Sequence, residues 1–592
     1  MNTIKYSILV VILLVGGLFV KGCQDLEVTN TNEPTREAVL GDVDNTLKLL
    51  RGGFQDATSS VVSSWGVAMH HMSDQTTATN AFRSYWPDFS GQPRLSINNT
   101  TAYSAEAAIN TYWGDLNSTI ATANQFIGLI EQEDRQFVDE GDDLTKQILS
   151  QAYFLRGFSR GYLGLIYDQA YMLEPNPEGT PENPEFSDYA TVIDGALSDL
   201  ERAITLADEF ESETGLSFVF ATMPNTSDSW TKAEYKEILN SLAARFLAGK
   251  ARTPSEAANV DWEQVETYAD NGLGGMNATT GLGDWTASNV GSSGDYANYL
   301  ADWANFVVTC GETLDTCAGY NPTDVKQLHL LDPDYPVNYP ADQASAGEAS
   351  LDPAQSDDPR LGYFVYTTNP GYLDPTRNPT LFTNYFSLRY YANNDWWPAS
   401  HGITFITSVE VDMLKAEAQL MQNNPIGAAT TLNNSTAGDG TISLSIDLPS
   451  VQLGVMSSNG MSGGHELTGT ESTAEFQWAL LREYSVELSL MGGAGLQWYF
   501  MRRHDLLQPG TPTMFPVPGE ELELTGRENY TYGGADNAGS AGAAAGDNEW
   551  RELANKAFGN TKAITNSTSK YNPVINSDIP TPDKSTKGAK QK

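Results

Sequence analysis

The sequence predicts a mostly α-helical protein, in which tetratricopeptide-type pairs of antiparallel helices carry a large, irregular subdomain built from loops. Three observations point to this fold class. Apolar residues recur every three or four positions over long stretches, which is the period of a helix. Cap signatures precede several of these stretches. One long interval, residues 272–405, lacks the helical period, and no clean repeat of the tetratricopeptide consensus accompanies the helices.

Strong helical patterns occupy the first half of the chain. One runs from Thr145 to Gln169 and places on a single face Ile148, Ala152, Leu155, Phe158, Tyr162 and Leu165. Another follows Ser187 and repeats the pattern at Tyr189, Val192, Ile193, Ala196, Leu200, Ala203 and Ile204. Thr231 and Glu234 form a capping box, in which each side chain accepts from the backbone N–H of the other residue, ahead of Tyr235, Ile238, Leu239, Leu242, Phe246 and Leu247. Asp261 caps a further helix through Trp262, Val265 and Ala269.

The helical pattern resumes after the irregular interval. It returns at Met413, Leu414, Glu417 and Leu420. Asn424 and Pro425 form the cap and first turn of the next helix, which continues through Ile426, Ala429 and Leu432. Ser472 with Glu475 opens the last strong helix, through Phe476, Ala479, Leu480, Tyr484 and Leu488. Because short loops join these helices, we expect them to stack as antiparallel pairs.

Two stretches are expected to be irregular. Residues 272–405 are rich in Gly, Asn, Asp, Pro and aromatic residues, and a segment of this length without regular structure is usually functional when it is ordered. Residues 536–592 contain Gly, Ala, Asn and Ser runs and a basic end formed by Lys584, Lys587, Lys590 and Lys592. We expect much of this low-complexity tail to be mobile or packed only on the surface.

The N-terminus reads as a lipoprotein signal peptide over residues 1–22. Lys5 lies in its charged start, an apolar stretch runs from Ile8 to Val20, and small Gly22 precedes Cys23. The apolar stretch is short for a membrane span, which needs about 20 residues. A lipid on Cys23 would tether a folded domain to a membrane surface. Because Lys21 stands where such signals usually carry a small or apolar residue, an ordinary cleaved leader and a secreted soluble protein remain the alternative.

The charge of the chain excludes one class of partner. The net charge is −41, and it becomes −43 when the leader is removed with Lys5 and Lys21. Nucleic-acid binding depends on Lys and Arg that neutralise phosphates, so this composition argues against it. Strong acidity mainly favours solubility. Because no long charged or Pro-rich linker precedes the tail, residues 23–535 are interpreted as one large domain.

Once Cys23 carries a lipid, the remaining cysteines are Cys310 and Cys317, in a Gly/Thr/Asp segment. An exported protein meets an oxidising compartment, so we expect these two to form a loop-closing disulfide, with a pair of free thiols as the alternative. Two cysteines without a nearby histidine make a poor zinc site.

The sequence shows no catalytic motif. His465 and Glu466 lack the second histidine of a His-Glu-x-x-His zinc site, and the adjacent His70 and His71 diverge in either a helix or a strand. A nucleophile turn of the Gly-x-Ser-x-Gly type and a phosphate-binding glycine loop are both missing. We therefore predict no catalytic residue, metal site or cofactor.

Two possibilities stay open at this point. The 75 acidic residues could include a glycoside-hydrolase pair, for which only a separation of about 5 to 9 Å in space is diagnostic. A structural calcium ion could bind where acids crowd, as at Asp332 and Asp334, although no EF-hand loop is present.

Several stretches, in order along the chain, form a distinctive set. The early ones are residues 23–35, beginning Cys-Gln-Asp-Leu-Glu, then Ala152–Phe158 and the Asp-Leu-Glu-Arg-Ala-Ile helix ending at Ile204. The later ones are Asp357–Leu361, Met413–Ala418, Leu481–Leu488, and the most specific stretch, Trp498–Arg503 followed by Leu507–Thr511 and Phe515–Pro518. Together they resemble the SusD/RagB family of cell-surface nutrient-binding lipoproteins, over roughly residues 23–535.

The resemblance implies a binding protein rather than an enzyme. Such a protein has a tetratricopeptide-like scaffold that packs on a TonB-dependent outer-membrane transporter of the SusC type. It acts as a hinged lid that captures an oligosaccharide, or sometimes a peptide, and delivers it to the barrel. Asp25 and Glu27 resemble the acidic signal that sends such lipoproteins to the outer face of the outer membrane. Family members differ most in their loops, so no binding residue is carried over.

The chemistry of sugars suggests where a ligand would bind. Sugars present flat C–H faces ringed by hydroxyls, so exposed aromatic rings flanked by polar side chains are the expected surface. The candidates from the irregular interval are Trp285, Trp303, Trp396 and Trp397. Trp86 and Arg83 are added from the early irregular segment that follows His70–Gln75. A packed aromatic ring is the alternative for each tryptophan.

Other conspicuous residues are interpreted as structural. Trp262 and Trp498 lie inside helical patterns and are predicted to be core residues. Arg502 and Arg503 are expected to pair with Glu483 or Glu487 rather than with a ligand. The competing functional classes are a structural or adhesive surface lipoprotein and, with less support, a glycoside hydrolase.

Overall fold

The computed structural model describes the chain over the following residues: 43–62, 67–78, 85–176, 184–214, 218, 230–282, 284–287, 321–332, 334–340, 351–356, 358–366, 378–387, 403–437, 440–442, 446–448, 451–452, 466–490, 495–558 and 574–575. The chain divides into two compact units after Lys48. Of the first unit, Met1–Lys48, the structure describes the beginning of helix α3 (Val43–Val62). The features below belong to the second unit, Leu49–Lys592.

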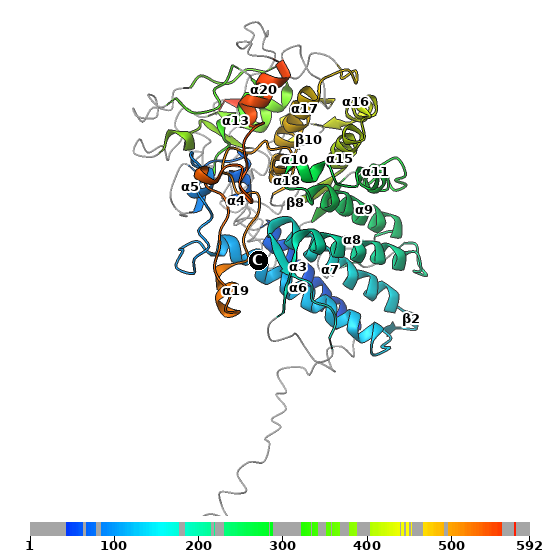
Figure 1. Ribbon diagram of the computed structural model, residues 1–592. Helices are drawn as coiled ribbons and strands as arrows, with labels where there is room; N and C mark the ends of the chain where they lie inside the picture. The colour runs from blue at the N-terminus through cyan, green and yellow to red at the C-terminus, as the bar shows by residue number, and fades with distance from the viewer. Residues whose placement is uncertain are drawn as a thin grey trace, which may run out of the picture. The chain divides into compact units, whose positions relative to one another are not determined.

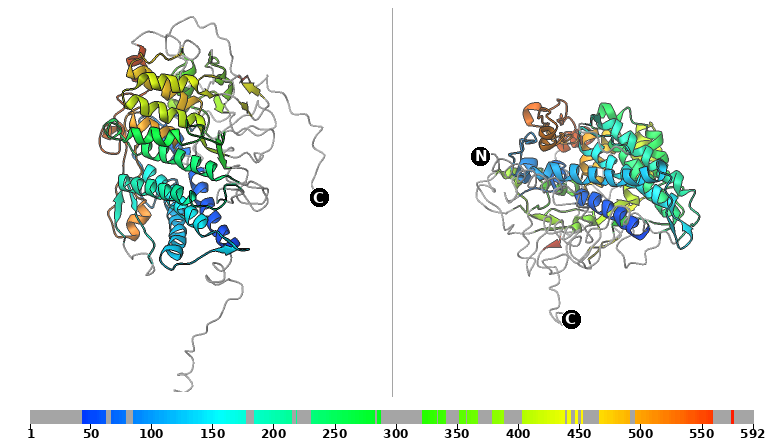
Figure 2. Two further views of the ribbon diagram at one scale, coloured as in Figure 1. Left: turned by 90° about the vertical axis from the view of Figure 1, so that its right-hand side faces the viewer. Right: turned by 90° about the horizontal axis from the view of Figure 1, so that it is seen from below.

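A series of helices forms the scaffold of this unit, and each helix packs against the next in the chain (Figure 1). The series is α6 (Ala107–Glu131), α7 (Thr145–Ile166), α8 (Tyr189–Ala207), α9 (Lys232–Gly249), α11 (Trp262–Asp270), α15 (Ser408–Met421) and α16 (Pro425–Asn434). Figure 2 shows the cyan, green and yellow members of the series one above another. The predicted stack of helical pairs is confirmed.

Shorter helices and small sheets surround the scaffold. The other helices are α4 (Val67–Met72), α5 (Tyr85–Ser90), α10 (Pro254–Ala257), α13 (Val325–Leu331), α17 (Thr473–Val486), α18 (Leu496–Arg503), α19 (Gly519–Leu524), α20 (Trp550–Phe558), and the 3₁₀ helices η3 (Pro359–Tyr363), η4 (Pro379–Leu381) and η5 (Ala535–Asn537). Antiparallel strand pairs are β1 (Val138–Asp139) with β2 (Asp142–Asp143), β3 (Gln169–Tyr171) with β4 (Phe186–Asp188), β5 (Asp284–Ala287) with β8 (Ile403–Thr407), β9 (Thr436–Ala437) with β12 (Val451–Gln452), and β10 (Gly440–Ile442) with β11 (Ile446–Leu448). Strand β6 (Phe364–Tyr366) pairs with β7 (Tyr385–Ser387) and, in parallel, with β13 (Val574–Ile575).

Local sequence signals set the ends of the helices as predicted. Both capping boxes form, at Thr231 with Glu234 and at Ser472 with Glu475. Asp261 caps α11, and Asn424 caps α16 with Pro425 in its first turn. Each cap satisfies backbone N–H groups that have no partner inside the helix.

Helix α7 lies at the centre of the scaffold and is buried over most of its length. The last carbonyl groups of a helix have no N–H donor inside that helix, so other groups must donate to them. The Arg502 guanidinium donates to the carbonyl of Leu165 (2.7 Å) and to that of Gly249 at the end of α9 (2.8 Å). The Arg252 guanidinium donates to the carbonyls of Gly164 and Tyr167, each at 2.6 Å. Two cations therefore sit at the negative ends of helix dipoles.

Aromatic rings complete the surroundings of these two arginines. The Arg252 guanidinium lies 3.7 Å from the centre of the Tyr189 ring, and that of Arg502 lies 4.6 Å from the Trp498 ring. Cation–π contacts of this kind stabilise a charge that is out of reach of water. Trp498 is fully buried and Trp262 is 5% exposed, which confirms both as core residues.

The predicted pairing of Arg502 and Arg503 with Glu483 or Glu487 is wrong. Arg502 binds backbone carbonyls, as described above. Arg503 forms a bidentate contact with Glu417 on α15, in which each hydrogen bond is 2.6 Å long. Glu483 is instead occupied by Arg360 and Arg482. The spacing of charges along the sequence could not reveal Glu417, because α15 and α18 meet only through the packing of the stack.

The first part of the predicted low-complexity tail, residues 536–558, contains exposed residues and also residues of the core. Ala543 and Ala544 are buried, and the backbone of Ala544 exchanges hydrogen bonds with Gly510 and Thr511. Helix α20 packs on α17 with Trp550 and Leu553 fully buried. Apolar residues spaced by three within a low-complexity stretch thus complete the core.

The irregular interval carries only short elements where it is described. Between Gly272 and Phe405 these are β5, α13, η3, β6, η4, β7 and the start of β8, as the loop-built subdomain predicts. In the part of the chain that the structure describes, no helix has the length and apolar character needed to cross a membrane.

Helices α7 and α9 pack so closely at Gly161 that the site has no room for a Cβ atom. A Cβ placed at Gly161 on α7 would lie 2.2–2.5 Å from ring atoms of Phe246 on α9. We expect Gly161→Ala to lower the free energy of unfolding by about 1–3 kcal/mol, because the ring or the helix must shift. Gly114→Ala is the matched control, since nothing lies within 4 Å of its Cβ on α6, and it should raise the same quantity by up to about 1 kcal/mol. Urea denaturation checks both, and equal effects of the two variants would contradict the packing argument.

Candidate functional site

Most residues proposed from sequence as site residues lie outside the described residues. These are Cys23, Arg83, Trp303, Cys310, Cys317, Trp396 and Trp397. The backbone of Trp86 lies in α5 and that of Trp285 in β5, while their side chains are also outside the description. The structure instead shows how the ends of the segments that carry these residues are held.

The described surface offers no fully exposed aromatic ring. Its large exposed apolar side chains are all aliphatic or methionine, namely Leu49, Leu95, Val138, Met276, Ile426 and Leu524.

The first anchor of these segments is the strand pair β5–β8. Ala287, the last described residue before Trp303, pairs with Ile403, the first described residue after Trp396 and Trp397. The strand pair thus brings together two chain segments that are more than a hundred residues apart in sequence.

Arg245 on α9 ties this strand pair to the scaffold. Its guanidinium binds both carboxylate oxygens of Glu410 on α15, at 2.7 and 2.6 Å, and donates to the hydroxyl of Tyr162 at 2.8 Å. It also donates to the carbonyl of Phe405 in β8. Arg245 and Glu410 are almost fully buried, so the bidentate contact is shielded from water.

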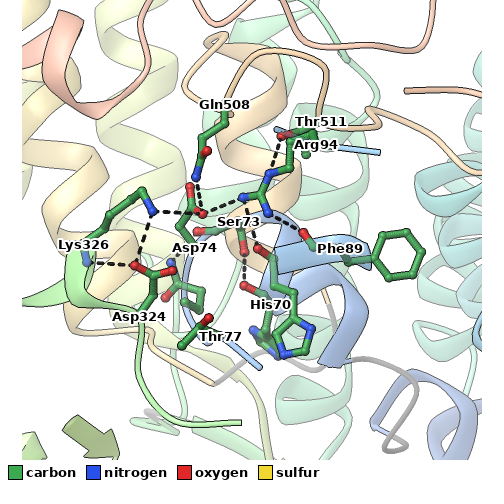
Figure 3. Close-up of polar contacts among 12 residues, drawn as sticks. His70, Ser73, Asp74, Thr77, Phe89, Arg94, Asp324, Lys326, Gln508 and Thr511 are labelled. Carbon is green, nitrogen blue, oxygen red and sulfur yellow. Dashed lines mark hydrogen bonds and ion pairs between the residues drawn. The ribbon is translucent and has the colours of Figure 1, made fainter. Parts of the chain in front are cut away.

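The second anchor is a buried cluster around Asp74, at the end of α4 (Figure 3). One Asp74 carboxylate oxygen accepts from Arg94 (2.6 Å) and Gln508 (2.6 Å) and lies 3.6 Å from the Lys326 ammonium. Lys326 in turn lies 3.4 Å from Asp324. These four charged residues, Asp74, Arg94, Asp324 and Lys326, are called the Asp74 cluster below. Their formal charges sum to zero, and each of the four side chains is at most 4% exposed.

Backbone contacts fix residues 321–327 against this cluster. The N–H of Thr77 donates to Pro322 at 2.8 Å, and the N–H of Asp324 donates to Gln75 at 3.2 Å. The Gln327 side chain donates to the carbonyl of Asp74 at 2.9 Å. The chain therefore returns to the cluster immediately after the segment 288–320, which contains Trp303, Cys310 and Cys317.

Arg94 also closes the segment that contains Arg83 and Trp86. Its guanidinium binds Asp74 before that segment and donates to the carbonyl of Phe89 after it (Figure 3). A further hydrogen bond from Arg94 reaches the hydroxyl of Thr511 at 3.2 Å. One planar guanidinium with five N–H donors can hold three separate segments in this way.

The two anchors serve the same segments. Segment 288–320 leaves β5 and returns to the Asp74 cluster at Asn321. Segment 388–402 leaves β7, whose Tyr385 carbonyl accepts from Thr323 beside the cluster, and returns to β8. Each of these two segments therefore has one end at the β5–β8 pair and the other beside the Asp74 cluster. The segment with Arg83 begins at the Asp74 cluster. The described ends of these segments thus lie at one or the other of the two anchors.

A buried ionic network fastens another part of the loop subdomain. Arg360 in η3 binds Glu483 on α17 at 2.5 Å and Asp358 at 2.7 Å, and Arg482 also binds Glu483 at 2.8 Å. The opposite charges favour the ionised acids, so the pKa of Asp358 and that of Glu483 lie below their ordinary values even though burial acts to raise them.

Burial shifts the ionisation of several groups at the Asp74 cluster. It raises the pKa of Asp324 to about 6, against the opposing effect of Lys326. It lowers the pKa of His70 and that of His71 to about 3, so both rings are neutral at pH 7. His71 lies 2.9 Å from the side-chain oxygen of Asn321, which fits a neutral ring that donates from Nε2.

Within the described ranges, no group of three or more His, Cys, Asp or Glu side chains is placed to hold a metal ion. Asp332, a possible calcium ligand from sequence, accepts backbone N–H groups of Asp334 and Gln355 at 3.1 and 2.7 Å. Its role in the described structure is to shape this turn.

Sequence reasoning missed the Asp74 cluster, although it noted the segment from His70 to Gln75. Asp74 meets Gln508 and Lys326, which are hundreds of residues away in sequence, so no local pattern marks them. In the structure Asp74 adopts a left-handed backbone with φ of 54°, which Asp tolerates better than most residues.

Removing the guanidinium of the Asp74 cluster should be costly. We expect Arg94→Met to lower the free energy of unfolding by about 3–5 kcal/mol, because it leaves Asp74 buried beside fewer compensating charges. Lys146→Met is the control. It breaks the exposed ion pair with Glu209, and the free energy of unfolding should be nearly unchanged. Chemical denaturation followed by circular dichroism measures both, and a small effect of Arg94→Met would refute an anchoring role.

Acidification should weaken folding below about pH 6.5. Unfolded histidines take up protons near that pH, whereas His70 and His71 stay neutral in the folded protein down to about pH 3, so their contribution is complete above pH 6.5 and declines toward pH 3. Asp324 acts in the opposite direction between about pH 6 and 4, but it is one group against two. Denaturation between pH 7.5 and 4.5 tests this. A His70→Leu variant should lose less stability than the original protein, and equal losses would contradict the assignment.

Known structures share the fold. A SusD superfamily protein from Parabacteroides distasonis aligns with a TM-score of 0.52 and 12% identity, over 82% of this chain and 98% of its own. A SusD-like protein from Bacteroides fragilis aligns with a TM-score of 0.51 and 13% identity, over 79% and 88% of the two chains. A SusD homolog from Bacteroides thetaiotaomicron aligns with a TM-score of 0.50 and 15% identity, over 84% of this chain and 98% of its own.

The comparisons by sequence found no match. No protein-family model matches the chain, and no curated protein matches it either. The likeness is therefore one of three-dimensional structure, and it extends over nearly the full length of two of the three solved proteins. This chain has the SusD-like fold, a tetratricopeptide-type helical scaffold.

Proposed function

We propose that this protein is a SusD/RagB-family lipoprotein that captures oligosaccharides, or peptides, at the cell surface. In this proposal it is anchored in the outer membrane through a lipid on Cys23 and faces the exterior. It acts as a lid on a SusC-type TonB-dependent transporter and delivers its ligand to that barrel without breaking a bond.

The observation that carries the proposal is the sharing of two anchors by the aromatic segments. The strand pair β5–β8 and the Asp74 cluster hold the ends of the segments with Trp303, Trp396 and Trp397. Binding residues are commonly found on loops that a rigid scaffold positions, because loops vary without disturbing the core. The SusD-like fold supports the same interpretation, but fold alone does not establish function.

The chemistry of these segments suits a neutral ligand with flat apolar faces. Tryptophan rings offer stacking surfaces, and the Asn and Asp residues beside them can bind hydroxyl groups. The net charge of −41 disfavours polyanionic ligands. We therefore favour neutral oligosaccharides over uronate-rich ones.

A structural or adhesive surface lipoprotein is the second candidate function. The buried ionic anchors would suit a rigid docking module equally well. It differs from the proposed function in a simple way, since a scaffold that only docks neighbouring proteins binds neither a soluble glycan nor a transporter. A glycoside hydrolase would release product from the ligand it binds.

Replacing the paired tryptophans should weaken ligand binding. We expect W396A/W397A to reduce the affinity for a bound neutral oligosaccharide by about tenfold or more, equivalent to about 1.4 kcal/mol, through loss of stacking. Calorimetry against a panel of neutral oligosaccharides and peptides measures this. Trp230→Ala is the control, because this half-buried ring lies next to the scaffold helix α9 and should leave affinity unchanged. Loss of helical circular dichroism in W396A/W397A would make the two rings core residues.

Membrane attachment and partnership are tested together. Cys23→Ala should move the protein from the membrane fraction to the soluble fraction. If the variant stays in the membrane fraction after a high-salt wash, the result counts against a lipid anchor. Affinity purification from mild-detergent extracts of the outer membrane should recover a TonB-dependent barrel with the unaltered protein. Recovery of the protein alone would favour the adhesive alternative.

A further inference from the structure

A separate groove lies on the helical scaffold, between α8 and the segment α10–α11. Its volume is about 590 Å³, which is within the range of ligand sites. Its lining comes from residues 189–201 and 247–268, so it contains none of the segments that carry the tryptophan candidates. An inference about this groove therefore stands independently of the proposed function.

The floor of the groove is aliphatic. It is formed by Leu197, Leu247, Ala251 and Val260, of which the first three are buried and Val260 is half-buried. Two tyrosines also line the groove: Tyr268 is only 5% exposed and its hydroxyl donates to Glu201, and one face of the half-buried Tyr189 ring is covered by the Arg252 guanidinium at 3.7 Å. A floor of this kind fits an aliphatic side chain better than the face of a sugar, which prefers a flat aromatic ring.

The rim of the groove is acidic. Four carboxylates line it, from Asp194, Glu201, Glu256 and Asp261, against the single ammonium of Lys250. Lys250 is already engaged, since it lies 2.6 Å from Asp194. The lining therefore has a net charge of −3 at pH 7.

The rim carboxylates keep capacity for further donors. Glu256 accepts the N–H of Arg252 at 2.7 Å, and Asp261 accepts the N–H of Gln264 at 3.0 Å. A carboxylate has about four acceptor positions, so each can bind another cationic or N–H donor. An incoming Lys or Arg would meet these oxygens without breaking the contacts with Arg252 and Gln264.

We infer that this groove binds a polypeptide segment that carries Lys or Arg next to an aliphatic residue. The aliphatic side chain fills the floor, and the cations meet the rim by charge complementarity. Acidic peptides and uronate glycans are repelled by the same rim. The partner is a separate peptide or protein segment, and neutral sugars lack the cation that the rim selects.

A second hollow on the molecule shows why acidity alone is insufficient. It is lined by Thr101, Glu106, Glu520, Glu523 and Leu524, and it shares the acidic character of the groove. Its one apolar side chain, Leu524, is 77% exposed, so it has no buried floor. This hollow supplies a matched control for the effect of charge.

The test uses the full-length protein and a short fluorescein-labelled peptide of alternating lysine and leucine, followed by fluorescence anisotropy. E256Q/D261N should weaken binding by about tenfold and reduce its salt dependence, since Gln and Asn keep the local hydrogen bonds but remove two charges. E520Q/E523Q removes two charges from the control hollow and should leave affinity unchanged. Val260→Thr, which is nearly isosteric, should weaken binding several-fold by adding a hydroxyl to the floor.

Five results would overturn the inference. Equal losses in both double variants would reduce the binding to general acidity, and no loss in Val260→Thr would remove the role of the floor. Displacement of the peptide by neutral oligosaccharides would make the groove a sugar site. Tighter peptide binding by K584A/K587A/K590A/K592A would identify the chain's own lysines as the occupant. Binding of the matched glutamate–leucine peptide with equal affinity would likewise exclude selection by charge.

Discussion

Buried guanidinium groups hold the irregular parts of this protein to its helices. Arg94, Arg245 and Arg360 are each at most 2% exposed, and each joins segments that are distant in sequence. Arg245 links α9 to α15 and β8, and Arg360 links η3 to α17. The geometry of the group explains its use, because a planar fork of five donors can satisfy several acceptors at fixed angles. A lysine ammonium could not hold as many segments in one plane.

This mode of attachment suits a subdomain with little regular structure. Long runs of strand hydrogen bonds are not available to fix residues 321–387 in place, since the described strands there are three residues long. Apolar contacts are non-directional, so alone they would allow neighbouring loops to exchange positions. A buried charge has no such freedom, because separating it from its partners leaves it uncompensated. The ionic anchors therefore determine which loops meet, and the helices provide a fixed base for them.

The two binding surfaces inferred for this protein follow different physical rules. The aromatic segments are attached through the residues at their ends, which belong to the β5–β8 pair or lie beside the Asp74 cluster. The groove on α8 and α11 is made from the scaffold itself, with an aliphatic floor and an acidic rim. A variable surface on loops and a fixed surface on helices can thus coexist, since changes in the loops leave the stack intact.

The sequence by itself determined the scaffold helices from α7 to α16, with their caps and their order, whereas α6 was not among the predicted helices. Those signals are local: the capping boxes at Thr231 and Ser472 join residues three apart, and apolar periodicity marks the buried faces. Only the tertiary structure decided the partners of the buried charges, such as Glu417 for Arg503 and Gln508 for Asp74, and the burial of Trp550. The physical reason is that an ion pair or a core contact depends on distance in space, and packing of the whole stack sets that distance between residues that lie far apart along the chain.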